Sequence, residues 1–504
     1  MDADYIVVGT GSAGSVVANR LSADPAVDVV VLEAGPRDKD KFVHIPAGFS
    51  KLFRTEMDWD YLTEPQKELD GREIYWPRGK VLGGSSSMNA MMWVRGFAAD
   101  YDEWAEHAGE QWDYAHVEKY YARIENGPLV ISAQRSPRSS TALWLTAAQE
   151  CIDAPVGFCE TRVTQRRGAR WSTADAYLKP ALRRRNLTLH TQATATRVVF
   201  EGKRAVGVEF EQLGARRVVR ARREVVLCGG AINSPQLLML SGIGDRDQLA
   251  EHRIDVVHDA PDVGTNLLDH LVVPMGFDVP SDTLFAAEKP LQLINYLVRR
   301  RGMLTSNVGE AYGFVKSRPD LDLPDLELIL ATAPFFDEGI GDPYAGHAVG
   351  IGPILLKPRS RGTITLRSSD PKDKPIIDPR YLTDDAGEDR AALMSGLRMC
   401  AKIVQSAAFR GLVTGIARPS GATSLDDETF EKALNTLSHT LYHPVGTCRM
   451  GSDEASVVDP QLRVRGVDGL RVADASVMPT IIRGHTHAPS VLIGERAADL
   501  IRES

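Results

Sequence analysis

The first 33 residues constrain the fold of this 504-residue chain more than any other segment. An apolar run at Tyr5–Val8 is followed at once by Gly9-x-Gly11-x-x-Gly14 and then by small and apolar residues typical of a short helix. A second apolar run ends at Glu33, 19 residues beyond the last glycine. Strand, glycine turn, helix, strand and acid in this order predict a Rossmann-like dinucleotide-binding unit.

Each residue of this pattern has a physical task. Gly9 permits the tight turn, Gly11 lets the backbone approach a pyrophosphate, and Gly14 allows the helix to pack closely on the strand. The free N–H groups of the helix N-terminus face the phosphate charge, and Glu33 can accept hydrogen bonds from a ribose diol. FAD and NAD share this fingerprint, so it does not choose between them. Three neighbours belong to the same expected site: Ser12, Ala13 and Ala34.

Composition excludes several other classes of protein. Acidic residues number 67 and basic residues 59, and a net charge of −8 argues against nucleic-acid binding. The five cysteines show no CxxC spacing, so we expect reduced thiols in a cytoplasmic protein and no metal site. No apolar run reaches the roughly 18 residues of a membrane span.

The remaining pattern predicts a mixed α/β fold, α+β overall. Residues 187–210 and 224–230 are expected to form strands, and residues 387–406, 426–437 and 489–502 helices. Residues 270–380 combine many prolines with strand-like alternation, which predicts an antiparallel sheet rather than βαβ repeats.

Four further motifs follow the first along the chain. Arg78–Asn89 contains a glycine pair followed by three serines, a loop that can wrap a diphosphate with N–H and hydroxyl donors. The others are Gly229–Gly244, His443–Gly451 and the segment from Asp474 to Pro489. Together the motifs resemble the glucose–methanol–choline (GMC) family of FAD-dependent alcohol oxidoreductases, in the same order and from end to end of the chain.

The resemblance implies a fold and a division of the chain. The FAD-binding domain would comprise residues 1–112, 187–266 and 440–504. The substrate-binding domain, residues 113–186 and 267–439, would cover the flavin with its antiparallel sheet.

It also implies how FAD is held. Val198 would contact adenine through its backbone, and Ala231 would lie near the adenosine half. The pyrophosphate and isoalloxazine would be followed by Gly83, Gly84, Asn89 and Ala90. Asp474 and Ala475 would approach the pyrophosphate and ribityl chain, and His487 and Pro489 would border the pyrimidine end. The expected set also contains Trp59, Arg78, Gly79, Val81, Met91 and His485. Met88 stands where some relatives bond a histidine to the flavin, so we expect non-covalent FAD.

Alcohol oxidation needs a group that takes the hydroxyl proton while hydride passes to flavin N5, and histidine suits that task. By resemblance, His443 is the expected base and His487 its partner toward the substrate oxygen. Two close imidazoles titrate as a pair, so the division of roles stays open.

His485 is the alternative to His487 as the partner of His443. In an extended segment the two would point to opposite faces. A metal site of His485, His487 and Asp474 lacks supporting ligand spacing.

The substrate is expected to be an uncharged primary alcohol. Choline-acting relatives carry a glutamate where this chain has Val272, which cannot neutralise a cation. Tyr442, Phe335 and Phe336 are candidates for the pocket wall. Three alternatives remain at this point: choline dehydrogenase-like activity, hydroxynitrile lyase and fatty-acid photodecarboxylase. Neither the electron acceptor, oxygen or a quinone or other carrier, nor the choice between monomer and dimer is specified by a motif.

Two connections are unusually abrupt, after Glu125 and near Ala154. Relatives carry loops near the active-site entrance at these places. We hypothesise that a mobile lid is missing here from the numbered chain. An intact mass equal to that of the 504 residues would contradict this hypothesis.

Overall fold

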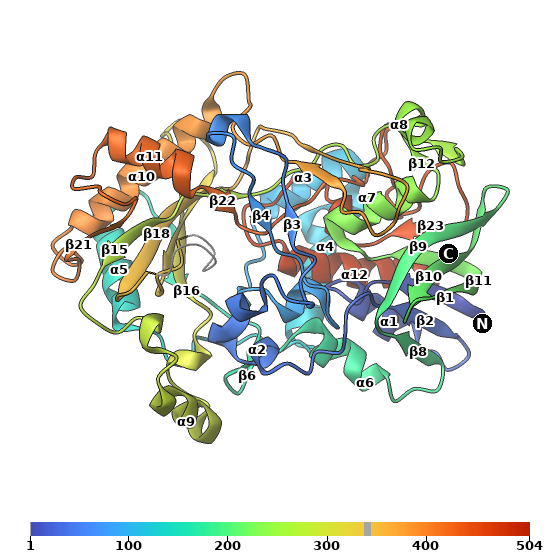
Figure 1. Cartoon of the computed structure of the whole chain (residues 1–504), viewed down its shortest axis with the longest axis horizontal. Helices are drawn as coiled ribbons and strands as arrows, with labels where there is room; N and C mark the ends of the chain where they lie inside the picture. Colours follow the sequence, from blue (N-terminus) through green and yellow to red (C-terminus); the bar gives the residue numbers. More distant parts are fainter. Residues whose placement is uncertain (1, 337–343) are drawn as a thin grey trace.

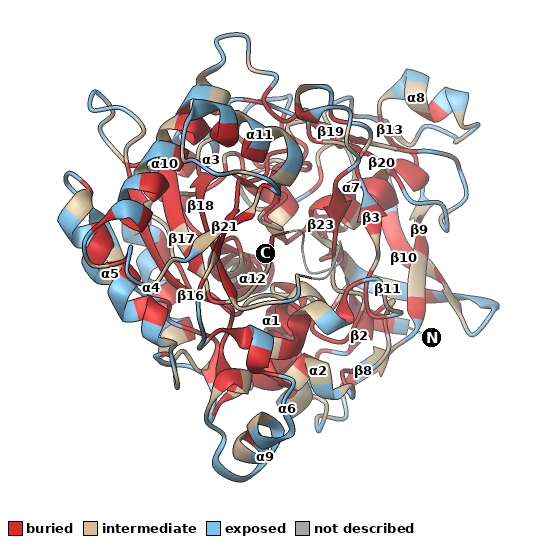
Figure 2. Cartoon of the chain, turned by 60° about the vertical axis from the view of Figure 1, so that its left-hand side comes forward, coloured by how far each residue is buried: buried red, intermediate tan, exposed pale blue. Residues whose placement is uncertain are grey.

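The computed structural model describes residues 2–336 and 344–504. Two sheets dominate the structure and lie on opposite sides of it, with helix α12 (His487–Glu503) running between them toward the first sheet (Figure 1). Strands of both sheets contribute to one large hydrophobic core. Figure 2 shows that the strands are largely buried, whereas the outward faces of the helices are exposed.

The first sheet combines a parallel part with an antiparallel ribbon. Its strands in spatial order are β8 (Leu187–His190), β2 (Val29–Leu32), β1 (Asp2–Val8), β11 (Ala215–Leu227), β10 (Arg204–Gln212) and β9 (Ala193–Glu201), with β23 (Leu470–Val472) pairing β11 in parallel. Almost every residue of β1 and β2 is buried, as expected of strands covered on both faces. Helix α1 (Gly14–Leu21) follows β1 and packs against α12. The predicted Rossmann-like unit is confirmed.

The second sheet is antiparallel throughout. Its strands in spatial order are β21 (Gly415–Arg418), β15 (Met275–Asp278), β18 (Ala348–Leu355), β17 (Leu326–Ala331), β16 (Gly309–Val315) and β5 (Val156–Glu160), and β14 (Leu271–Val272) joins β18 to β22 (His439–Thr440). Helix α10 (Glu388–Gln405) packs on β17 and β18, and α5 (Ser139–Cys151) and α11 (Asp427–Leu437) lie beside it. The prediction of an antiparallel sheet over 270–380 is therefore confirmed.

The other elements connect or flank these sheets. The helices are α2 (Lys41–His44), α3 (Ala98–Ala108), α4 (Tyr114–Glu125), α6 (Lys179–Ala181), α7 (Gly230–Leu240), α8 (Arg246–Glu251) and α9 (Pro290–Arg299). Short antiparallel ladders pair β3 (Tyr61–Leu62) with β4 (Tyr75–Trp76), β6 (Gln165–Arg166) with β7 (Ala169–Arg170) and β19 (Thr363–Thr365) with β20 (Ile376–Asp378), while β12 (Ile243–Gly244) pairs in parallel with β13 (His258–Asp259). The division into two interleaved domains stays a prediction.

Three expected absences can be compared with the described residues. All five cysteines are free thiols. Within residues 2–336 and 344–504, no helix is long and apolar enough to cross a membrane. In the same residues, no group of three or more histidine, cysteine, aspartate or glutamate side chains is arranged to hold a metal ion.

Candidate functional site

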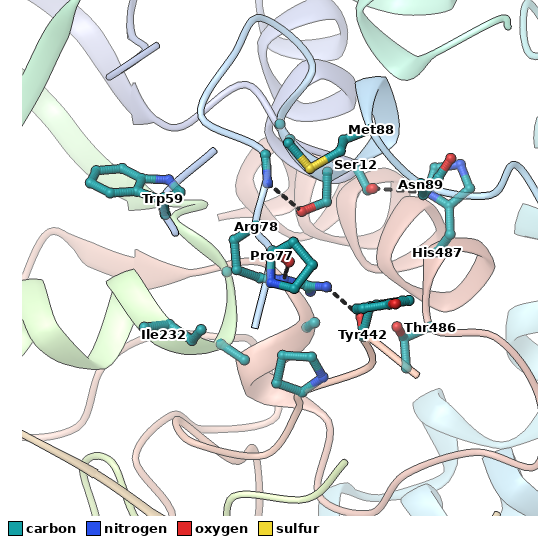
Figure 3. A pocket seen from close by; sticks show the side chains of 18 of the residues that line it. Ser12, Trp59, Pro77, Arg78, Met88, Asn89, Ile232, Tyr442, Thr486 and His487 are labelled. Carbon is teal, nitrogen blue, oxygen red and sulfur yellow. Dashed lines mark hydrogen bonds between the residues drawn. The ribbon is translucent and has the colours of Figure 1, made fainter. Parts of the chain in front are cut away.

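A cavity of 330 Å³ lies between the two sheets. Its wall includes Val8 and Leu32 from the first sheet and Val272, Ile329 and Gly352 from the second. Figure 3 shows several lining side chains from close by, among them Trp59, Arg78, Met88 and Tyr442. The cavity joins the glycine turn after β1 to the histidines of the C-terminal third of the chain.

The glycine turn after β1 tolerates no side chain at two of its three glycines. Gly9 has φ +100°, and a Cβ there would lie 2.4 Å from the Cys228 carbonyl oxygen. A Cβ on Gly14 would lie 2.1 Å from the Gly9 carbonyl oxygen. A Cβ on Gly11 would meet no protein atom within 4 Å, although Gly11 lines the cavity. Gly9 and Gly14 thus serve the fold, and Gly11 leaves room for a ligand.

Glu33 is fixed at the end of β2. One carboxylate oxygen accepts the Thr10 N–H at 3.0 Å and also the Thr10 hydroxyl, and the other accepts the Gly35 N–H at 2.8 Å. Burial raises the pKa of this carboxyl above its ordinary value. Glu33 therefore lines the cavity in one fixed orientation, as a ribose-binding acid requires.

The serine-rich loop of the Arg78–Asn89 motif packs against the glycine turn. A Cβ on Gly84 would lie 2.8 Å from the Gly11 Cα, and the Gly83 N–H donates to the Thr10 hydroxyl at 3.0 Å. The Ser86 and Ser87 hydroxyls turn inward and donate to the Gly83 and Leu82 carbonyl oxygens. These two serines hold the loop together and do not offer their hydroxyls to the cavity, unlike the expectation from sequence.

Asp474 ties the C-terminal segment to α7. Its carboxylate accepts the Gly230 N–H at 2.8 Å, the Ser234 hydroxyl at 2.6 Å and the Ser476 N–H at 2.8 Å. Burial raises the pKa of Asp474. The carboxylate thus orients the N-terminus of α7 along the cavity wall.

Most of the expected residues line this one cavity. They are Gly9, Gly11, Ser12, Ala13, Glu33, Ala34, Trp59, Arg78, Gly79, Gly84, Asn89, Ala90, Met91, Ala231, Phe335, Tyr442, His443, Asp474, Ala475, His485 and His487. Gly14, Val81, Gly83 and Pro489 lie behind the wall.

Two expected positions lie outside the set of residues that line the cavity. Val198 is absent from the cavity wall, and its N–H donates to the Ser241 hydroxyl at 2.8 Å. Ala193, Thr194 and Ala195, at the start of β9, line the wall instead. Phe336 is also outside: it packs on Tyr344 and against Gly276, while Phe335 reaches the cavity.

Three histidines from distant segments meet at the far end of the cavity. The ring centroids of His443 and His485 are 4.8 Å apart in an edge-on arrangement. The Nδ1 atoms of His443 and His270 are 2.9 Å apart, and the His270 Nε2 lies 3.1 Å from the Leu356 carbonyl oxygen. His270 and His443 flank the paired strands β14 and β22, which fixes their separation.

These contacts determine which ring nitrogens carry protons. The Leu356 carbonyl can only accept, so His270 donates from Nε2. Burial lowers the pKa of His270 to about 3, so its ring is neutral and its Nδ1 accepts the Nδ1–H of His443. Burial also lowers the pKa of His443 well below its ordinary value, with neighbouring His485 and His270 adding to the effect. His443 is neutral near pH 7, with its Nε2 lone pair free to take a proton.

His485 has an acidic partner on a strand of the second sheet. Its Nε2 lies 3.1 Å from one oxygen and 3.2 Å from the other oxygen of Glu327, a fully buried side chain on β17. Sequence reasoning missed Glu327, because no local motif marks it. His270 follows Asp269 directly in the sequence, but only the fold brings it to His443.

His487 is not the neighbour of His443 that the sequence predicted. Its Nδ1 lies 2.8 Å from the Ser12 hydroxyl in the glycine turn (Figure 3). Its ring packs edge-on against Trp93. Its Nε2 is buried and has no hydrogen-bond partner among the described residues. Burial lowers the pKa of His487 to about 4. The structure pairs His443 with His485, and His487 belongs with the glycine turn.

The turn that carries His443 is fixed by hydrogen bonds to Asp269 and Arg78. Asp269 accepts the His443 N–H at 2.8 Å, and the half-buried Arg78 donates from Nη2 to the Tyr442 carbonyl oxygen at 2.7 Å. Tyr442 has φ +69°, a conformation that few non-glycine residues adopt. Burial raises the pKa of Asp269 to about 6. These contacts fix the position of the His443 ring.

The cavity next to the histidines is apolar. Phe49, Phe53, Phe335, Val272 and Met88 line it. Of the described lining residues, only Glu33 and Asp474 carry a carboxylate and only Arg78 carries a guanidinium or ammonium group. All three are already bonded within the wall.

Comparison with known proteins identifies the family. A family model of the GMC oxidoreductase N-terminal part matches residues 3–272, and one of the C-terminal part matches residues 358–494. The chain is a GMC oxidoreductase. A GMC-type oxidoreductase of Mycobacterium tuberculosis is 71% identical to it over 523 aligned positions, which cover 99% of each chain.

Two better-described proteins are similar over nearly the whole length. An alcohol dehydrogenase (acceptor) of Pseudomonas putida is 40% identical, covering 99% of this chain and 95% of the relative. The crystal structure of pyridoxine 4-oxidase from Mesorbium loti superposes with a TM-score of 0.88 at 30% identity, covering 100% of this chain and 99% of the other.

The alignment with the M. tuberculosis relative is longer than this chain. Its 523 positions exceed the 504 residues of this GMC oxidoreductase by 19, so the M. tuberculosis relative carries residues that face gaps here. After α4 the chain turns tightly, with the Asn126 N–H donating to the Ala122 carbonyl oxygen at 3.1 Å and the Gly127 N–H to that of Ile124 at 3.1 Å. A missing lid remains a hypothesis for the intact mass to test.

Membership of this family implies FAD, and the residues present fit it. Glu33, the open side of Gly11 and the N-terminus of α7 form a cradle for the adenosine and pyrophosphate parts. The orphaned Nε2 of His487 needs a polar partner at the cavity wall, which a flavin carbonyl or ring nitrogen can supply.

Proposed function

We propose that this GMC oxidoreductase oxidises an uncharged primary alcohol to an aldehyde. The observation that carries the proposal is the neutral His443, whose proton-accepting Nε2 belongs to a side chain on the wall of an apolar cavity. A neutral imidazole of this kind can accept a hydroxyl proton as a general base. The similarity to an alcohol dehydrogenase of P. putida supports the substrate class.

The two histidines have different tasks in this proposal. His443 takes the hydroxyl proton at Nε2, and its Nδ1–H bond to His270 stabilises the resulting imidazolium. His485, bonded through Nε2 to Glu327, contacts the substrate oxygen with its other ring edge and holds the alcohol against His443. FAD, when bound, supplies the acceptor for the hydride that leaves the alcohol carbon.

The composition of the cavity argues against two alternatives. Choline needs a counter-charge, yet Val272 is apolar, and Glu33 and Asp474 are bonded to backbone N–H groups of the nucleotide end. A fatty-acid photodecarboxylase needs a cation for the carboxylate, but Arg78 already donates to Tyr442. A hydroxynitrile lyase remains the runner-up, because a histidine pair can also perform proton transfer alone.

We also propose that FAD is bound non-covalently. Met88 lines the cavity, and its thioether forms no bond to a flavin of the kind a histidine forms. Acid precipitation should leave the yellow colour in the supernatant, and colour in the pellet would contradict the proposal. Oxygen or a quinone-type carrier is the proposed final electron acceptor, and the five free thiols fit a cytoplasmic location.

Anaerobic absorbance of the purified holoenzyme tests the main proposal. A panel of primary alcohols, with choline included, is added to the oxidised protein. Bleaching of the flavin bands by uncharged alcohols is the expected result, and its rate ranks the substrates. The variant His443→Gln should retain FAD and lose bleaching. Flavin that stays oxidised with every alcohol, together with cleavage of a cyanohydrin, would overturn the proposal in favour of the lyase.

A further inference from the structure

Helix α9 projects from the body of the molecule (Figures 1 and 2), and several of its apolar side chains are exposed. Six of the twelve large apolar side chains that are exposed in the described chain lie between residues 285 and 298. Their exposed fractions are Leu291 76%, Val298 76%, Leu297 60%, Ile294 56%, Phe285 46% and Leu293 45%. We call Leu291, Leu293, Ile294, Leu297 and Val298 the apolar face of α9.

The opposite side of α9 faces the protein with polar groups. Tyr296 is buried, and its hydroxyl donates to the His44 carbonyl oxygen at 3.2 Å. Gln292 and Asn295 share this side, and both of their amide groups crowd the position of a Cβ on Gly302. A surface helix of a water-soluble domain buries its apolar stripe and exposes its polar one. The arrangement in α9 is the reverse, which requires an apolar environment outside the protein.

Basic residues flank the apolar face at both ends. Lys289 precedes the helix, and Arg299, Arg300 and Arg301 end it and follow it, all of them exposed. The nearby Glu288 is 2.8 Å from Lys51 and is thus already in an ion pair. An apolar helix face bordered by Lys and Arg is the pattern of helices that lie in the interface of an anionic bilayer.

We propose that α9 is a membrane-docking helix that inserts its apolar face into the surface of a phospholipid bilayer with anionic headgroups. A second copy of this chain fits less well. Ten residues of helix are about 15 Å long, and such a pair covers far less than the ~800 Å² per partner of a stable interface. An antiparallel pair would also place Lys289 against the arginines of the other copy.

The docking helix is attached to the wall of the cavity. The segments on either side of it, Leu284–Ala287 and Met303–Val308, pack in an apolar cluster with Phe49, Phe53 and Met88, which line the cavity. Docking would therefore bring this wall close to the bilayer, where apolar alcohols and quinone-type acceptors dissolve. This last consequence rests on the proposed function, whereas membrane binding itself does not.

Vesicle flotation of the full-length holoenzyme tests the proposal. The vesicles contain phosphatidylcholine and phosphatidylglycerol in equal parts, or phosphatidylcholine alone. We expect the protein to float with the anionic vesicles and to bind the neutral ones much less. The double variant Leu297→Glu, Val298→Glu should bind at least tenfold less. The control Leu213→Glu removes an 82% exposed leucine from the turn between β10 and β11 and should bind like the wild type.

Both variants change exposed side chains, so flavin absorbance and Tm should match the wild type and show that the fold is intact. Equal flotation of the wild type and the double variant would overturn the proposal, as would no flotation of the wild type. A dimer that becomes monomeric in the double variant, with no vesicle binding, would also overturn it in favour of a second copy. Alcohol-dependent flavin bleaching is measured separately, without vesicles. A failure of the proposed alcohol oxidation can therefore be distinguished from a failure of membrane binding.

Discussion

The two ends of the cavity are built in different ways. At the nucleotide end, Gly9, Gly11, Gly14 and Glu33 lie within 25 residues of one another and act through backbone geometry. At the histidine end, the reactive groups come from four segments separated by at least 40 residues: His270, Glu327, His443 and His485. The nucleotide end is formed by one local sequence motif, whereas the histidine end forms only when both sheets have folded.

The largest effect is expected from the glycine turn. Gly14→Ala would press its Cβ onto the Gly9 carbonyl oxygen, and we expect a loss of about 3 kcal/mol or more and little holoenzyme. Gly11→Ala is the matched control, because its Cβ meets no protein atom within 4 Å. It should keep the Tm of the apoprotein but weaken FAD binding about tenfold or more, one tenfold step being 1.4 kcal/mol. A Gly11→Ala protein with unchanged FAD affinity would place the pyrophosphate elsewhere.

The second prediction separates the two histidines that are two residues apart. His485→Gln should slow flavin reduction by about 10²-fold or more, because it removes the contact with the substrate oxygen proposed beside His443. His487→Gln should slow it less than about tenfold but weaken FAD binding, since its ring is held by Ser12. Stopped-flow reduction and FAD titration measure the two effects. The opposite ranking would restore His487 as the partner of His443.

The third prediction uses the pKa shifts of buried groups, which have opposite signs at the two ends of the cavity. Burial raises the pKa of Glu33 and Asp474 at the nucleotide end, whereas it lowers the pKa of His439 to about 4 at the histidine end. A lowered histidine pKa means that the unfolded chain binds more protons below pH 6.5, so stability falls as the pH drops from 6.5 toward 4.

For His439 this amounts to about 2 kcal/mol between pH 7 and pH 5. Urea unfolding of the wild type and of His439→Gln at both pH values measures it. The loss of stability should be smaller in the variant by about that amount. An equal loss in both proteins would mean that His439 is not held neutral by the fold.

The smallest effect is expected from the contact between Ser12 of the glycine turn and His487. Ser12→Ala removes the 2.8 Å contact with His487 and should weaken FAD binding by about 1 kcal/mol, roughly fivefold. Flavin reduction at saturating FAD should be unchanged. A large loss of reduction rate would show that the glycine turn also positions the reacting groups.

The same contrast explains what the sequence could predict. The β1–α1–β2 unit and the antiparallel sheet followed from apolar patterning and glycine spacing, and both are confirmed. The expected adenine contact of Val198 stays a prediction, because the residues of strand β9 that line the cavity are its first three. His487 was chosen over His485 by resemblance, and opposite faces were expected only for an extended segment. Thr486 is instead helical and α12 begins at His487, so the rings separate for a different reason. Glu327 depends on sheet packing and could not be inferred.

The hydrogen bond from His270 to the Leu356 carbonyl also restricts how this protein can diverge. The bond leaves residue 270 with only an acceptor for His443. Asparagine offers a carbonyl oxygen and could replace it during evolution, whereas lysine or arginine would donate and reverse the proton arrangement of His443. A position that never touches substrate is thereby limited to a few amino acids.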